Sequence, residues 1–153
     1  VGMHTQLKQS AVDALLRTKR FFKEENDAEK KAGEIMDYVG LKNVGNELAR
    51  NLPYGGQRRI EIGRALAANP TLLLLDEPTA GMNPNETEDA IKLFRRIRDD
   101  KGITVLLIEH DMKVVMPLSD KILVMDEGRK IAEGSPSEIQ NNPRVIAAYL
   151  GED

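Results

Sequence analysis

Two adjacent carboxylates follow a short apolar run in the middle of the chain. Residues 72–75 are four leucines, and Asp76 and Glu77 come directly after them. Breaker residues flank this run, which favours a buried strand ending at the acids. Ligands bind at the carboxyl ends of strands in open parallel α/β sheets. One carboxylate there can support a hydrated Mg²⁺ while the other polarises a water molecule, although a strand that simply ends in exposed acids has the same pattern.

A histidine and a glycine-containing turn are the other candidates for chemistry. His110 follows Ile103–Ile108, a run that predicts a strand buried on both faces. Residues 52–56 cannot continue a helix, and they lead into a helix predicted over Gln57–Ala68. Free N–H groups at a helix N-terminus bind anions such as phosphate. Taken alone, a strand-end histidine more often has no role, and such a turn can merely start a helix.

The flanking segments predict alternating helices and strands. Residues 83–86, Asn-Pro-Asn-Glu, form a capping-box pattern for a helix that runs to about residue 100. Strands separated by helices between residues 71 and 125 imply a parallel sheet with crossover helices. Ile122–Met125 and Lys130–Ala132 flank a turn that contains glycine, so they predict a hairpin at the antiparallel edge of that sheet.

Residues 1–50 predict a helical layer. An apolar pattern from Ala28 to Val39 has the spacing of one helix face, and Gly40 follows where a left-handed cap is wanted. A polar loop at Lys23–Asn26 separates this helix from an earlier one. The earlier apolar pattern consists of Leu7, Ala11 and Leu15.

Composition excludes several classes of protein. The 153 residues include no cysteine and only two histidines, which excludes disulfides, thiol catalysis and cysteine-ligated metals. No apolar run approaches the roughly 18 residues of a membrane span, and the first residues lack the apolar core of a signal peptide. Residues 1–69 hold 12 basic and 9 acidic residues, and residues 70–153 hold 10 and 16. The resulting net charge of −3 argues against a nucleic-acid-binding protein.

The order of these motifs resembles that in the ATP-binding subunits of ABC transporters, over nearly the whole chain. The motifs are the glycine-containing turn, Leu72–Glu77, Ala80–Asn83 and Glu109-His110. The resemblance implies ATP and Mg²⁺ as ligands, with Asp76 as the Walker B aspartate that supports Mg²⁺. It implies that Glu77 positions or deprotonates the attacking water and that His110 is the switch histidine that contacts the γ-phosphate.

The turn and Ala80–Asn83 resemble the signature motif and the D-loop of that family. An ungapped comparison puts Pro53 at the signature serine and Tyr54 at the first glycine, and it retains only Gly55. The resemblance implies that this turn faces the γ-phosphate presented by a partner subunit, although proline lacks the serine hydroxyl. It implies nucleotide-site roles for Pro53, Tyr54, Gly55, Gly56, Gln57, Gly81 and Asn83.

Within the family, the chain resembles the larger ATP-binding subunit of branched-chain amino acid importers. Tyr54-Gly55, residues 77–87, residues 108–116 and Asn141–Glu152 carry this narrower resemblance. It implies an ATPase at the cytoplasmic face of the membrane, peripheral to it. The implied partners are a second ATPase subunit and transmembrane permease subunits, with no nucleic acid.

The chain contains no Gly-x-x-x-x-Gly-Lys-Ser/Thr phosphate loop. We therefore expect an α/β, P-loop NTPase-like fold that is incomplete, without the Walker A strand and the Q-loop region. Residues 1–51 are expected to be part of the helical subdomain, and residues 52–153 the C-terminal part of the ATPase core. The chain alone is expected to be inactive, and its sheet to expose two apolar edges.

Two alternatives stay open. A non-transport ABC ATPase acting on DNA or ribosomes would be expected to carry coiled-coil heptads or a long basic insert, and neither occurs here. A non-catalytic interaction module without a phosphate loop would leave Asp76, Glu77 and His110 idle, yet all three are present.

Overall fold

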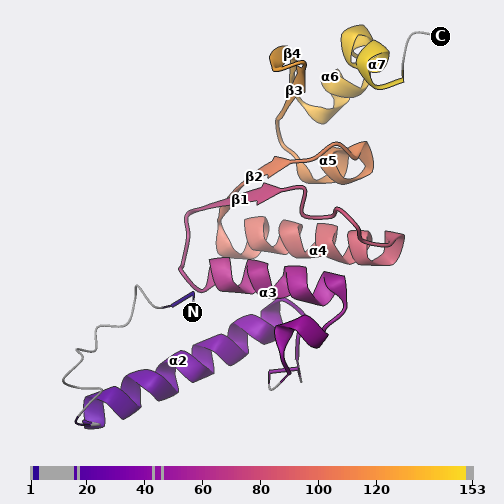
Figure 1. The fold of residues 1–153 in the computed structure, drawn as a ribbon. Helices are drawn as coiled ribbons and strands as arrows, with labels where there is room; N and C mark the ends of the chain where they lie inside the picture. Colours follow the sequence, from indigo (N-terminus) through magenta and orange to yellow (C-terminus); the bar gives the residue numbers. More distant parts are fainter. Residues whose placement is uncertain (1, 4–15, 17, 43, 46, 151–153) are drawn as a thin grey trace.

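The structure is a computed structural model that describes residues 2–3, 16, 18–42, 44–45 and 47–150. In these ranges the helices are α2 (Lys19–Tyr38), the 3₁₀ turn η2 (Ala49–Asn51), α3 (Tyr54–Leu66), α4 (Pro84–Lys101), α5 (Met112–Leu118), α6 (Pro136–Gln140) and α7 (Pro143–Leu150). The strands are β1 (Leu72–Asp76), β2 (Thr104–Ile108), β3 (Ile122–Asp126) and β4 (Arg129–Gly134). Figure 1 shows them stacked from α2 at one end to α6 and α7 at the other. The helix predicted on Leu7, Ala11 and Leu15 lies outside the described residues.

Helix α2 is uninterrupted, so the prediction of a polar loop at Lys23–Asn26 is wrong. The helix begins at a Thr18 cap, whose Oγ1 accepts a hydrogen bond from the backbone N of Phe21 at 3.3 Å. Arg20 Nε donates to Glu24 Oε1, one turn later, at 3.2 Å. Lysine and glutamate are good helix formers, and most side chains of this stretch are exposed, so polarity alone does not break the helix.

The end of α2 confirms the predicted role of Gly40, whose φ is +80°. A left-handed residue at this position ends many helices. Arg59 Nη1, from α3, donates to the carbonyl oxygen of Val39 at 3.0 Å. A Cβ atom at position 40 would lie 2.5 Å from the same Nη1. Glycine therefore both ends α2 and leaves room for the guanidinium that ties α2 to α3.

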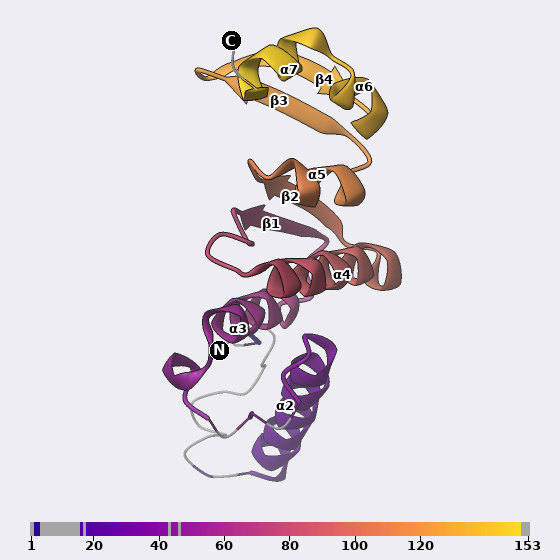
Figure 2. The ribbon, with the colours of Figure 1, turned by 90° about the vertical axis from the view of Figure 1, so that its right-hand side faces the viewer.

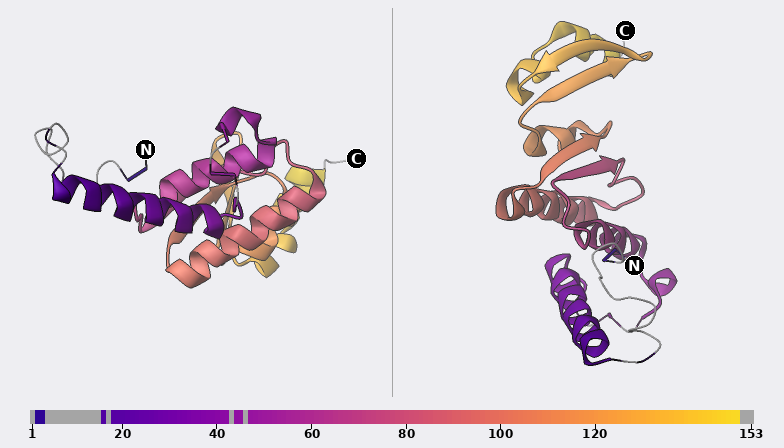
Figure 3. Two further views of the ribbon diagram at one scale, coloured as in Figure 1. Left: turned by 90° about the horizontal axis from the view of Figure 1, so that it is seen from below. Right: turned by 90° about the vertical axis from the view of Figure 1, so that its left-hand side faces the viewer.

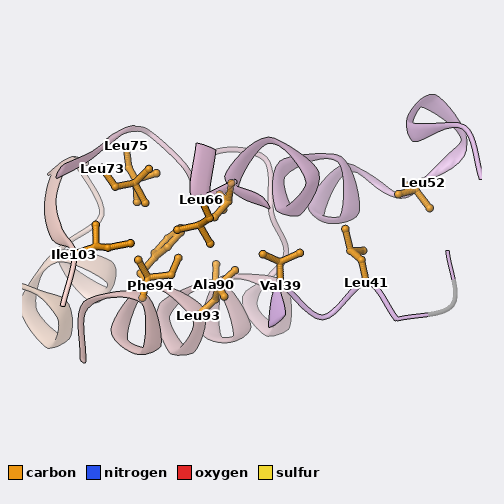
Figure 4. Packing of buried hydrophobic residues seen from close by; sticks show 12 residues of the cluster. Val39, Leu41, Leu52, Leu66, Leu73, Leu75, Ala90, Leu93, Phe94 and Ile103 are labelled. Carbon is orange, nitrogen blue, oxygen red and sulfur yellow. The ribbon is translucent and has the colours of Figure 1, made fainter. Parts of the chain in front are cut away.

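One hydrophobic core joins the end of α2 to α3, α4 and β1 (Figure 4). Helix α4 forms one side of it, with Phe94 2% and Ile97 0% exposed. The predicted capping box of α4 is confirmed, because Asn83 Oδ1 accepts from the backbone N of Glu86 at 3.0 Å and Glu86 Oε2 accepts from the backbone N of Asn83 at 3.0 Å. The other buried members of the core are Val39, Leu41, Leu52, Ile62, Leu66, Leu73, Leu75, Ala90, Leu93 and Ile103.

The strands form two separate sheets. Strands β1 and β2 pair in parallel, with Asp76 opposite Ile108, and β3 and β4 form the predicted antiparallel hairpin. The prediction that the hairpin is the edge of the parallel sheet is wrong for the described chain, because β3 does not pair with β2. A cavity of about 920 Å³ is lined by residues of β2 and of β3. Because strands must lie about 4.8 Å apart to pair, these two strands are too far apart to form one sheet. Figures 2 and 3 show the hairpin set apart from β1 and β2.

Strand β2 is buried on one face only, so the prediction of burial on both faces is wrong. Its residues alternate between exposed and half-buried, with Leu106 57% and Ile108 60% exposed. The parallel sheet packs its other face on the core through Val105 and Leu107. On β3, Leu123 and Met125 are also exposed and line the same cavity. An apolar sheet with one uncovered face is consistent with a partial P-loop NTPase fold.

Glu133 on β4 makes the stability of the hairpin sensitive to acid. Hydrogen bonds from Lys121 (2.5 Å) and Lys130 (2.9 Å) lower the pKa of Glu133 to about 2. A carboxylate with a depressed pKa stabilises the folded state when the pH is above its ordinary pKa, near 4.5. This contribution is lost as the pH falls toward 2. We expect a Tm difference between the wild type and Glu133→Gln at pH 6 that shrinks by pH 2. It should be small, since the pair is at the surface, and a difference that grows in acid would contradict this assignment.

None of the helices in the described ranges is both long and apolar enough to cross a membrane.

Candidate functional site

The carboxyl ends of β1 and β2 bring the predicted catalytic residues together. The two strands are parallel and in register, so the residues after Asp76 and those after Ile108 leave the same edge of the sheet. The backbone N of Glu77 donates to the carbonyl oxygen of Ile108 at 2.9 Å, which extends the pairing by one residue. The loop after β1 and the loop after β2, which are about 30 residues apart in sequence, thus begin side by side.

Glu77 and His110 face each other across this edge. Glu77 Oε1 lies 3.5 Å from His110 Nδ1, an ion pair whenever the imidazole is protonated. The backbone of Glu77 is left-handed, with φ at +41°, a conformation that is uncommon for a residue with a side chain. Both side chains are open to solvent, Glu77 at 53% and His110 at 71%. The pair can therefore reach a ligand that binds at this edge.

Asp76 is the candidate metal ligand. It is the last residue of β1 and is exposed. Among the described residues, no group of three or more histidine and acidic side chains could hold a metal on its own. Mg²⁺ is usually bound through one or two carboxylates together with substrate phosphates and water. A single exposed carboxylate at a strand end suits this kind of ligation.

Sequence reasoning missed the buried partner of these loops, Glu109. Its side chain is 1% exposed although its neighbour His110 is open to solvent. Glu109 Oε1 accepts hydrogen bonds from the backbone N of Thr79, at 3.2 Å, and from Thr79 Oγ1. Glu109 Oε2 accepts one from the backbone N of His110, at 3.2 Å. The sequence contains one signal of this, an acid directly after an apolar strand, but the signal does not reveal the partner 30 residues away.

The predicted signature turn is the first turn of α3. The helix begins at Tyr54, three residues earlier than predicted, with Pro53 as its N-cap. No side chain caps this end, so its N–H groups remain available to an anion. Gln57 Nε2 donates to the carbonyl oxygen of Leu52 at 2.9 Å, which anchors the turn. Glycine disfavours helices, which is why the prediction started the helix after Gly55 and Gly56; in the structure the helix begins directly after Pro53, a residue tolerated at a helix boundary.

The first turn of α3 lies beside the residues predicted as the D-loop. A Cβ atom on Gly81, whose φ is +76°, would lie 3.4 Å from the ring of Tyr54. Tyr54 Oη accepts hydrogen bonds from Arg58, at 3.0 Å from Nε and 2.8 Å from Nη2. Gly55 and Gly56 are also in this turn. A Cβ atom on Gly55 would lie 3.0 Å from Glu86 Oε1, so the turn also lies close to the start of α4. Asn83 is bound as the cap of α4, so the described contacts give it a structural role.

Comparison with known proteins gives a consistent result. A family model described as "ABC transporter" matches residues 3–80, and one described as "Branched-chain amino acid ATP-binding cassette transporter" matches residues 129–153. The chain is 46% identical over 152 residues to the high-affinity branched-chain amino acid transport ATP-binding protein LivG of Salmonella typhimurium, and 44% identical to the corresponding protein BraF of Pseudomonas aeruginosa. Each alignment covers 99% of this chain and 60% of the relative, so the chain spans about three fifths of their length.

Solved structures agree on the fold. The ADP conformation of an ATP-binding cassette of an ABC transporter matches with a TM-score of 0.77 at 32% identity, over 99% of this chain and 60% of that one. A dimeric post-hydrolysis state of another ATP-binding cassette, bound to ADP and Pi, matches with a TM-score of 0.64 at 28% identity, over 72% and 48%. With a family model that covers residues 3–80 and a parallel sheet ending in the expected motif residues, the chain belongs to the ABC transporter family.

Proposed function

We propose that this chain is the C-terminal part of the ATP-hydrolysing subunit of an importer for branched-chain amino acids. The observation that carries the proposal is the Glu77–His110 pair, 3.5 Å apart and exposed at the carboxyl edge of β1 and β2. The relatives named as branched-chain amino acid transport proteins support the choice of solute. The choice of solute rests on these relatives alone, since the proposed ATPase would act on the solute through its partners.

Each residue at the sheet edge has a proposed role. Asp76 would support Mg²⁺, which neutralises developing charge on the phosphates when it is bound. Glu77 would position the attacking water and accept its proton, which needs a carboxylate near the reacting oxygen. His110 would donate to the γ-phosphate, and its place beside Glu77 would hold both groups on one side of the nucleotide. The residues fit this chemistry because all three are exposed at one edge.

The turn formed by Pro53, Tyr54, Gly55, Gly56 and Gln57 would act on the nucleotide of a second ATPase subunit. An uncapped helix N-terminus attracts phosphate through its N–H groups and dipole. Gly81 lies next to Tyr54 of this turn, and Gly81 and Asn83 would line the same interface. In this arrangement ATP, Mg²⁺ and two such subunits complete each site.

The remaining partners follow from the same proposal. Residues 1–51 would form part of the helical subdomain that meets the transmembrane permease subunits, and residues 52–153 the C-terminal part of the ATPase core. The subunit would be peripheral, at the cytoplasmic face of the membrane. Nucleic acid would not be a partner, given the net charge of −3.

The test compares the complete subunit with this chain alone. We expect ATP hydrolysis only from the complete subunit assembled with its permease in membrane vesicles. The same vesicles should take up labelled leucine when ATP is supplied. The isolated chain should bind an apolar fluorescent dye strongly, because Leu106, Ile108, Leu123 and Met125 are exposed. The complete subunit should bind the dye weakly. Micromolar ATP affinity of the isolated chain, or no hydrolysis by the assembled transporter, would contradict the proposal and favour a non-catalytic interaction module.

A further inference from the structure

The buried carboxylate of Glu109 connects the two loops that carry the proposed catalytic pair. Its Oε1 atom holds Thr79, through the backbone N at 3.2 Å and through Oγ1. Its Oε2 atom holds the backbone N of His110 at 3.2 Å. Thr79 is only two residues beyond Glu77, and the backbone N of Ala80 donates to the carbonyl oxygen of Glu77 at 3.1 Å. One oxygen of Glu109 therefore binds the loop that carries Glu77, and the other binds the loop that carries His110.

Burial makes this connection stiff. The side chain of Glu109 is 1% exposed and Thr79 is 8% exposed. A buried carboxylate that loses a hydrogen-bond donor is left poorly solvated, so the donors and the acceptor hold one another in place. Glu77 and His110, by contrast, are exposed and long enough to adopt other rotamers. The backbone of the two loops, which Glu109 links, sets the positions from which both side chains extend.

We propose that Glu109 is a positioning residue that fixes Glu77 relative to His110 by holding the Thr79 turn against the loop after β2. This inference rests on the proposed function and adds to it a residue that does not touch nucleotide. Glutamine at position 109 has one oxygen that accepts and one NH₂ group that does not. It therefore leaves at least one backbone N–H, that of Thr79 or that of His110, without the acceptor that Glu109 supplies, while its shape is almost unchanged.

The test measures kcat and KM for ATP with the assembled transporter. Misplacement of catalytic groups by about 1 Å can cost up to roughly 10²-fold. We expect Glu109→Gln to lower kcat by about tenfold or more while KM for ATP stays within about twofold, because the Glu109 side chain is only 1% exposed and is proposed not to touch the nucleotide. Thr79→Val should also lower kcat, and Thr79→Ser, which retains the hydroxyl, should restore it. Glu127→Gln, in the exposed turn of the hairpin, is the matched control and should leave both constants unchanged.

Hydrogen exchange of the complete subunit without nucleotide supplies a readout that does not depend on activity. We expect faster exchange at the backbone amide of Thr79, of His110 or of both in Glu109→Gln, because at least one of these N–H groups loses its acceptor. Unchanged exchange, unchanged kcat, or a loss of kcat that Thr79→Ser does not restore would overturn the inference. If the wild type itself hydrolyses no ATP, the proposed function fails, and the exchange data still decide whether Glu109 links the loops.

Discussion

Glu77→Gln in the complete subunit is expected to lower kcat for ATP hydrolysis by about 10²–10⁴-fold, the range that a general base contributes. Glutamine has nearly the shape of glutamate and can still orient a water molecule, but it cannot accept the proton. The residue sits in a left-handed backbone position, φ +41°, and its side chain lies 3.5 Å from His110. ATP binding should persist, because Glu77 is proposed to act on the water and not on the nucleotide.

The measurement is single-turnover hydrolysis together with nucleotide binding at equilibrium. Glu88→Gln is the control, since Glu88 is 67% exposed on α4 and pairs only with Lys92 among the described ion pairs. It should hydrolyse ATP at the wild-type rate. A Glu77→Gln variant that retains hydrolysis would exclude Glu77 as the base, whereas one that loses ATP binding would place Glu77 in the nucleotide contacts instead.

Phe94→Ala is expected to destabilise the complete subunit by about 3–5 kcal/mol, the usual cost of removing a buried aromatic ring. Phe94 is 2% exposed and lies in the core between α3, α4 and β1 (Figure 4). The cost combines the lost apolar burial with a cavity that the surrounding helices cannot fill. A Tm lower by roughly 10 °C should result. Scanning calorimetry or thermal unfolding followed by circular dichroism measures it.

Phe22→Ala is the matched control for this loss. Phe22 is 52% exposed on α2 and meets the ring of Phe21 edge-on, with centroids 5.6 Å apart. Its removal should cost less than about 1 kcal/mol, as surface substitutions do. Equal losses in the two variants would mean that the core assigned here does not hold the fold together.

The local structure of the chain could be predicted from the sequence where short-range chemistry decides it. The cap of α4 at Asn83, the left-handed Gly40 and the hairpin over β3 and β4 all appear as predicted. Each depends on residues a few positions apart, so hydrogen bonding and backbone preference suffice. Two local predictions failed, because the polar stretch Lys23–Asn26 continues α2 and α3 already starts at Tyr54. The failures of longer range are the pairing of the hairpin with the parallel sheet and the burial of both faces of β2.

The candidate site divides in the same way. Asp76, Glu77 and His110 could be proposed as candidates because they stand at or just after the ends of apolar runs, and strand ends are where such groups lie. Glu109 could not be assigned, because its burial depends on Thr79, which is brought near only by the parallel pairing of β1 and β2. The one local sign, an acid directly after an apolar strand, does not show which group the carboxylate bonds.

The sequence by itself therefore determined the motif residues and their order, the helix caps and the hairpin, because these depend on residue type and near neighbours. Only the tertiary structure decided which strands pair and which apolar faces are covered. Strand β2 has apolar residues on both faces, yet burial follows the elements packed against it, and here only one face is covered. The same packing sets the 3.5 Å approach of Glu77 to His110, a distance between residues that the sequence separates by more than 30 positions.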